Sequence, residues 1–115
     1  MGVRKKETRV PASRMKIAVA RVLRDEGYIA GYDVIEDGKQ SMLRIQLKYG
    51  VRGEDVIHSI RRESTGGRRV YRKVSDLPKV LDGLGICVVS TSRGVISDRA
   101  CRELNVGGEL VCTVY

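Results

Sequence analysis

Phenylalanine and tryptophan are absent from this sequence, and its only aromatic residues are five tyrosines. A core built around large aromatic side chains is therefore excluded, and the interior must rest on aliphatic residues, methionine, cysteine and tyrosine. The 115 residues nevertheless have a hydrophobic fraction of 42%, which excludes an intrinsically disordered chain. This length allows one compact body or two small lobes.

Long hydrophobic runs are also missing. Apolar stretches such as Ile86–Val89 are far too short to span a bilayer. The first nine residues are too polar and charged to form a secretory signal. We therefore expect no membrane partner and a location in the cytoplasm.

Residue types that carry catalysis or bind metals are scarce. The only histidine, His58, is surrounded by aliphatic residues, and no nucleophile motif lies near it in the sequence. Cys87, Cys101 and Cys112 lack Cys-x-x-Cys spacing, so we expect three small buried side chains in a reduced chain. The sequence thus predicts no catalytic residue, no metal site, no cofactor and no enzymatic activity.

Positive charge is abundant and unevenly distributed. Lys and Arg number 22 against 14 Asp and Glu, giving a net charge of +8. Residues 1–30 and residues 61–73 each carry +5, whereas residues 31–60 and 74–115 each carry −1. Two concentrated cationic segments are typical of a surface that binds a polyanion such as a nucleic acid.

Periodicity in the first half predicts a helix followed by strands. Apolar residues at helical spacing indicate a helix from Ser13 to Glu26, with Ser13 as the N-cap. Alternating residues indicate strands at Tyr32–Glu36 and Ser41–Tyr49, joined by a turn at Asp37-Gly38, and a third strand at Val56–Glu63. We expect these elements, preceded by an extended segment, to form a first lobe over residues 1–64.

The second half predicts a further small lobe over residues 65–115. After a turn at Ser64–Gly67, the expected elements are strands at Arg68–Val74, Ile86–Ser90 and Glu109–Tyr115, a short helix that begins at Ser75 or Asp76 and includes Pro78, and a helix at Asp98–Asn105 capped by Ser97. The predicted fold class is α+β, with two small lobes that each pack a mixed or antiparallel sheet against one or two helices.

Two segments of the second half suggest contacts with a nucleic acid. The loop Ser90–Gly94 contains three hydroxyls, an arginine, and a glycine that permits close backbone approach. The strand Arg68–Lys73 surrounds Tyr71 with cations, so phosphates and a stacked base could both be bound. On composition alone, a plain polar turn is the favoured interpretation of the loop, and a solvated charged strand is as open as a nucleic-acid contact for Arg68–Lys73.

Four stretches resemble the bacterial form of the eighth small-subunit ribosomal protein family. They are Val10–Lys16, Leu77–Val80 with Gly83–Ile86, Ser90–Val95 with Asp98–Ala100, and Gly107–Glu109. The resemblance runs in order from about Val3 to Tyr115. It implies a two-lobed α/β protein that binds small-subunit rRNA directly, at an irregular stem of the central domain, and helps that domain assemble beside neighbouring ribosomal proteins.

The resemblance also implies which residues contact RNA. In the second lobe these are Ser90, Thr91, Ser92, Arg93, Gly94, Gly108, Glu109, Tyr71, Lys73 and Arg69; in the first lobe they are Ser13, Arg14 and Lys16. The hydroxyl loop would reach the minor-groove side of the stem. A carboxylate at Glu109 has the wrong charge for a phosphate, although it can accept a hydrogen bond from a base amine.

The sequence departs from the family pattern at two places. The first helix usual in the family is not seen here, by truncation or true loss, which would weaken the first lobe. Thr65-Gly66 replaces a turn where proline is common.

The surface expected to bind rRNA would also suit a translational regulator that binds messenger RNA. A small phosphate-handling enzyme that uses the Ser90–Gly94 loop is the remaining alternative.

Overall fold

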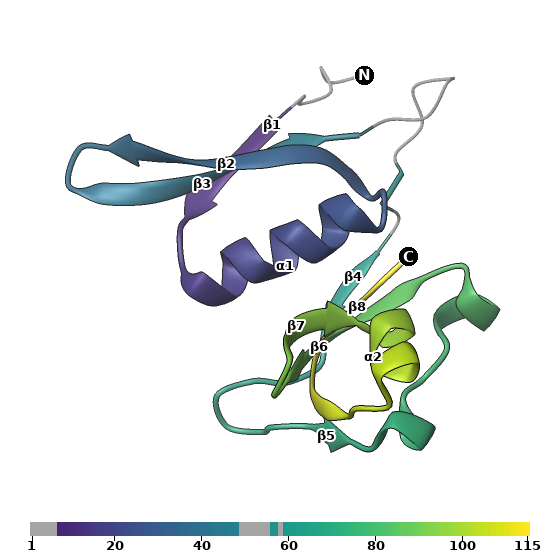
Figure 1. Ribbon diagram of the computed structural model, residues 1–115. Coiled ribbons are helices and arrows are strands. Elements are labelled where there is room, and N and C mark those ends of the chain that lie inside the picture. Colours follow the sequence, from purple (N-terminus) through teal and green to yellow (C-terminus); the bar gives the residue numbers. More distant parts are fainter. Residues whose placement is uncertain (1–6, 49–55, 58) are drawn as a thin grey trace. The chain divides into compact units, whose positions relative to one another are not determined.

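The computed structural model describes residues 7–48, 56, 57 and 59–115. These residues divide into two compact units, Met1–Val56 and Ile57–Tyr115, and each unit is described by itself. Helices and antiparallel sheets occur in both units (Figure 1), so the predicted α+β class with two lobes is confirmed.

The first unit contains one helix and a three-stranded antiparallel sheet. Its elements are β1 (Glu7–Pro11), α1 (Arg14–Asp25), β2 (Ile29–Asp37) and β3 (Gln40–Leu47), and the strand order is β1-β3-β2. The β2–β3 hairpin turns at Gly38, whose φ of +70° is a conformation that glycine adopts without strain. Helix α1 covers one face of this sheet (Figure 1).

Helix α1 forms where the sequence predicts it. The Ser13 hydroxyl oxygen accepts a hydrogen bond from the Lys16 amide at 3.1 Å, which caps the first turn, and Gly27 ends the helix with a φ of +85°. The expected apolar face is confirmed at Val22 and Leu23, which are buried. At its start Met15 is 42% exposed, so the buried face of the helix lies toward its C-terminal half.

The second unit packs helix α2 (Asp98–Leu104) on a five-stranded antiparallel sheet. The strands are β4 (Ile60–Arg62), β5 (Tyr71–Arg72), β6 (Ile86–Thr91), β7 (Gly94–Ser97) and β8 (Gly108–Val114). The order is β4-β8-β6-β7, and β5 pairs with the first residues of β8 beyond β4. Strand β6 is central, as its continuous apolar sequence predicts.

The core of the second unit lies between α2 and the sheet. It includes Leu77, Cys87, Val89, Cys101 and Leu110, all buried. The expectation of buried cysteines is confirmed, since Cys112 is buried as well. Burial, with a smaller effect of nearby Asp98, raises the pKa of the Cys87 thiol to about 12, and burial raises that of Cys112 to about 11. The thiols are therefore protonated and serve as packing groups.

The strand expected at 56–63 requires a correction. Strand β4 spans only Ile60–Arg62 and pairs with β8, so it belongs to the second unit and not to the first lobe's sheet. Alternation predicts that a segment is extended, but the partner is chosen by the free edge available, here that of β8. The first compact unit accordingly ends at Val56. His58 lies outside the described residues.

The Gly66-Gly67 turn is confirmed, but its surroundings differ from the prediction. Thr65 and Arg68 bridge across it, and the turn lies within the unit Ile57–Tyr115. The strand expected over Arg68–Val74 shortens to Tyr71–Arg72, because β8 offers only its first residues for pairing on that side.

The helix expected from Ser75 is wrong. Two 3₁₀ turns, Val74–Asp76 and Val80–Gly83, occupy this segment. Pro78 explains the break, since a proline disfavours helical backbone at the residue before it, and Leu77 is extended with a ψ of 128°. Leu81 and Asp82 then adopt left-handed φ angles of 48° and 54°, which stop any continuation of a helix.

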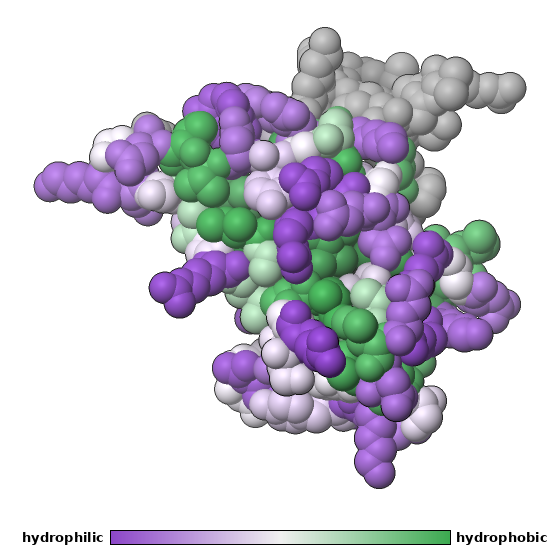
Figure 2. Space-filling model, in the orientation of Figure 1, coloured by the Kyte–Doolittle hydropathy of each residue, from purple (hydrophilic) through white to green (hydrophobic). Residues whose placement is uncertain are grey.

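Hydrophilic side chains cover much of the visible surface. Charged residues form 31% of the chain, and Figure 2 shows hydrophilic side chains projecting around patches of hydrophobic atoms. Among the helices of the described residues, none is both long and apolar enough to cross a membrane.

Candidate nucleic-acid interface

The hydroxyl-rich segment forms a tight β-hairpin. Thr91 pairs with Gly94 at the end of β6 and β7, so the turn itself consists of Ser92 and Arg93, both exposed. The prediction of a loop over Ser90–Gly94 is thus correct only at its centre. Gly94 has a φ of +107°, a conformation that an L side chain rarely adopts. The hairpin therefore presents the Ser92 hydroxyl and the Arg93 guanidinium at its tip.

The three hydroxyls of this hairpin have different hydrogen bonds. Thr91 Oγ1 donates to the Gly94 carbonyl at 2.8 Å and accepts from the Arg93 amide at 2.9 Å, which closes the turn. Within the part of the chain that the structure describes, no hydrogen bond engages the hydroxyls of Ser90 and Ser92. Two hydroxyls are thus available to a ligand, while the third holds the turn.

Pairing across three strands brings Tyr71 and Ser90 to the same face of the sheet. Glu109 of β8 lies opposite Tyr71 of β5 and also opposite Ser90 of β6. Directly opposed residues of antiparallel strands point to the same side. Tyr71 is 64% exposed, so its ring is open to a stacking partner. Two predicted segments separated along the chain are therefore neighbours in the fold.

The carboxylate of Glu109 is neutralised by Arg69. Arg69 Nη1 lies 3.0 Å from both Glu109 oxygens, and the Glu109 side chain is only 15% exposed. A bare carboxylate here would repel phosphates, but the ion pair removes that repulsion and keeps one end of the guanidinium outward. Sequence reasoning predicted both residues as RNA contacts and missed that they bind each other, since they are 40 residues apart.

Gly107 and Gly108 are required by close backbone packing. A Cβ added to Gly107 would clash with the Arg72 carbonyl oxygen, and one added to Gly108 would clash with the Ser90 carbonyl oxygen. The chain at positions 107 and 108 therefore fits against β5 and β6 only without side chains. This explains how the Ser90 strand and the Tyr71 strand approach the same segment.

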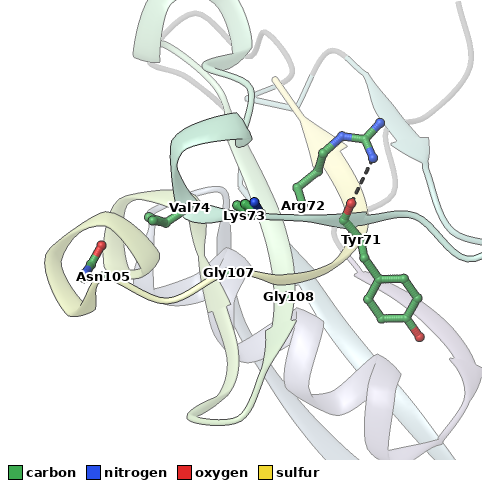
Figure 3. Close-up of a pocket in the computed structure, with 7 residues that line it drawn as sticks. All are labelled: Tyr71, Arg72, Lys73, Val74, Asn105, Gly107 and Gly108. Atoms are coloured by element: carbon green, nitrogen blue, oxygen red, sulfur yellow. Dashed lines mark hydrogen bonds between the residues drawn. The ribbon is translucent and has the colours of Figure 1, made fainter.

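A pocket of about 650 Å³ lies beside this row of strands (Figure 3). One side comes from β5 and the residues after it, and the other comes from the connection between α2 and β8. The lining residues are Tyr71, Arg72, Lys73, Val74, Asn105, Gly107 and Gly108. Sequence reasoning missed Val74, Asn105 and Gly107 as lining residues and gave Arg72 only as part of a basic run. A single asparagine after a helix carries no sequence signal beyond its use as a C-cap.

The cations predicted in the first lobe lie around the start of α1. Ser13 caps the helix, and Arg14 and Lys16 are exposed on its first turn. Their alignment with the second unit's hairpin stays a prediction, because the two units are described separately. Farther along α1, the Cζ atom of Arg24 lies 5.1 Å from the centroid of the Tyr32 ring, and Arg24 forms an ion pair with Asp25.

Metal chemistry finds no support in the described residues, where no group of three or more histidine, cysteine, aspartate or glutamate side chains could hold an ion. The arrangement that the structure does present consists of free hydroxyls, exposed cations and one open aromatic ring. These groups form hydrogen bonds, ion pairs and stacking contacts, which are the contacts that proteins make with RNA.

Comparisons with known proteins agree with this chemistry. The chain matches the family described as "Ribosomal protein S8" over residues 1–115. It is 57% identical over 106 residues to the small ribosomal subunit protein uS8 of Clostridioides difficile (strain 630), covering 92% of this chain and 80% of the relative. Identity to the uS8 proteins of Alcanivorax borkumensis and Moorella thermoacetica is 52% and 48%, over 96% and 98% of this chain and 84% and 87% of those relatives. The resemblance found in the sequence is confirmed, and the chain belongs to the ribosomal protein S8 family.

Proposed function

We propose that this protein is a structural component of the small ribosomal subunit and binds small-subunit rRNA directly. The β6–β7 hairpin and the β5 strand form the principal RNA surface, and the cations at the start of α1 add contacts to the phosphate backbone. The target is an irregular stem of the central domain, which the protein helps to assemble beside neighbouring ribosomal proteins. Membership of the ribosomal protein S8 family supports this proposal.

One observation supports the RNA surface above all others. Ser90, Glu109 and Tyr71 form a single row across β6, β8 and β5, with the Ser92–Arg93 turn at its end. Such a row offers hydroxyls that donate or accept and a ring that stacks, beside several cations. A-form RNA shows its 2′-hydroxyls and base edges in a wide, shallow minor groove, which a narrow hairpin can enter. The row therefore suits a stem whose shape is irregular enough to expose a base.

Direct binding to purified rRNA tests the proposal. In a filter assay at fixed salt, the full chain should bind small-subunit rRNA at least tenfold more tightly than large-subunit rRNA. Ribonuclease footprinting should then show one protected stem. Equal affinity for the two RNAs, or protection scattered over many sites, would contradict specific binding. Tighter binding to a messenger RNA than to rRNA would favour the regulatory alternative.

A further inference from the structure

The pocket beside β5 has a chemistry distinct from that of the hydroxyl hairpin. Tyr71 and Arg72 are successive strand residues, and Figure 3 shows their side chains on opposite sides of the strand. Tyr71 joins the row with Glu109 and Ser90, whereas Arg72 lies opposite Gly108. The pocket and the hairpin are thus neighbours joined through Gly108, with different groups available to a ligand.

The lining of the pocket combines positive charge with one neutral amide. Arg72 and Lys73 supply cations, Asn105 supplies a side chain that both donates and accepts, and none of the described residues that line the pocket carries a carboxylate. The Arg72 guanidinium gives one donor to the Tyr71 carbonyl at 2.9 Å and keeps its others. Within the described residues no hydrogen bond engages the Asn105 amide, and the side chain is exposed. An anionic ligand with an adjacent polar edge fits this set.

The size and openness of the pocket favour a ligand that is part of a larger molecule. Its volume of about 650 Å³ lies within the range of small-molecule sites, but Arg72, Lys73 and Asn105 are all exposed. A free small molecule would keep much of its surface in water. A nucleotide within an RNA already held by the hairpin would instead bind at high effective concentration.

We infer that this pocket receives a single nucleotide of the bound RNA, with Arg72 and Lys73 directed at its phosphate and the Asn105 amide at its base. This inference rests on the proposed function, because the hairpin must first hold the RNA. Val74 provides an apolar wall for the base or sugar, and Gly107 and Gly108 keep the opposite wall free of side chains. Asn105 is therefore the residue of the pocket that distinguishes one base from another.

The backbone at Asn105 allows a clean test. Asn105 caps α2 with a φ of 56° and a ψ of 48°, a left-handed conformation that glycine adopts at least as well. Asn105→Gly thus removes the amide and keeps the turn, so its melting temperature should match that of the wild type. Its affinity for the rRNA stem that the wild-type protein protects from ribonuclease should fall about threefold to tenfold, the value of one or two hydrogen bonds.

A matched pair of charge variants separates the pocket from general attraction. Lys73 and Lys79 are both exposed cations of the second unit, and only Lys73 lines the pocket. Lys73→Ala should weaken binding several-fold. It should also reduce the magnitude of the slope of log K against log salt by about one, the effect of one lost phosphate contact. Lys79→Ala should bind as the wild type does. Equal losses in both variants would contradict a phosphate held in the pocket.

Base deletion in the RNA identifies the nucleotide. Abasic substitutions are placed one at a time along the protected stem, and binding is measured for the wild type and for Asn105→Gly. At one position, removing the base should lower the affinity of the wild type as much as Asn105→Gly lowers the affinity for the intact RNA. Combining the two changes should then lower the affinity no further. If the wild type binds but no position shows this coupling, the pocket inference is wrong and the proposed function stands. If the wild type does not bind small-subunit rRNA, both are wrong.

Discussion

Single hydroxyl groups at the β6–β7 hairpin differ in whether the folded protein uses them. Thr91 gives its hydrogen to the Gly94 carbonyl and accepts from the Arg93 amide, whereas the Ser92 hydroxyl at the tip is engaged by no described residue. Composition identified these hydroxyls as a group. It could not separate them, because the separation depends on which residue enters the strand and which remains in the turn.

Ser92→Ala should therefore reduce recognition alone. Loss of one exposed hydroxyl that bonds only to RNA should weaken binding by about 0.5–1.5 kcal/mol. The melting temperature should not change, because no described hydrogen bond of the folded protein is lost. Filter binding and thermal unfolding measure the two effects. A wild-type affinity in this variant would remove Ser92 from the RNA surface.

Thr91→Ala should lower both the stability of the protein and its affinity for RNA. Removing Oγ1 leaves the Gly94 carbonyl and the Arg93 amide without their partner, so the turn loses about 1 kcal/mol and RNA binding weakens with it. Thr91→Ser keeps the oxygen and should restore the melting temperature and the affinity together. If Thr91→Ala melts as the wild type does, the turn does not depend on this hydroxyl.

Helix α2 holds the base of the hairpin through one buried carboxylate. Asp98 is 2% exposed; its Oδ1 accepts from the Cys87 amide of β6 at 3.1 Å, and its Oδ2 lies 2.6 Å from Arg102 Nη1. Arg102 also donates to the Leu77 carbonyl at 3.4 Å and the Pro78 carbonyl at 3.3 Å. One network thus connects a helix, the central strand and the irregular segment that replaces the expected helix.

Asp98→Ala should destabilise the protein strongly. It leaves the buried Cys87 amide unpaired and Arg102 without its carboxylate, which should lower the free energy of unfolding by about 3 kcal/mol. Asp98→Asn keeps an acceptor for the Cys87 amide, so it should lower the free energy of unfolding less than Asp98→Ala does. Urea unfolding of the full chain measures both, with Asp76→Ala, an exposed change, as the control. Equal unfolding free energies for Asp98→Ala and the control would contradict this role.

Elements with their own local signals were predictable from the sequence. The N-cap residues Ser13 and Ser97 predict helices α1 and α2. The alternation that buries Leu110, Cys112 and Val114 predicts strand β8. The helix break around Pro78 could have been predicted from that proline, but no sequence signal marks the left-handed conformations of Leu81 and Asp82, since neither residue is a glycine. The pairing of β4 with β8 could not be predicted either, because alternation does not indicate which sheet edge is free.

The two units of the molecule share its positive charge. The cations of residues 1–30 fall in the first unit, and those of residues 61–73 in the second. Phosphate contacts supply affinity that depends on salt, whereas hydroxyl and base contacts supply specificity that depends little on salt. We therefore expect substitutions in the two classes to have different signatures in one experiment. Salt titration of the binding constant distinguishes them.

The double variant Arg14→Ala, Lys16→Ala tests the first unit's part in RNA binding. Both side chains are exposed on the first turn of α1, and each lost phosphate contact should reduce the slope of log K against log salt by about 0.9. The slope should thus fall by about 2, while the protected stem stays the same. Ser92→Ala should show the reverse, with an unchanged slope and weaker discrimination between the correct and an altered stem. An unchanged slope in the double variant would mean that the first unit's cations do not reach the RNA, and that charge alone does not identify the surface.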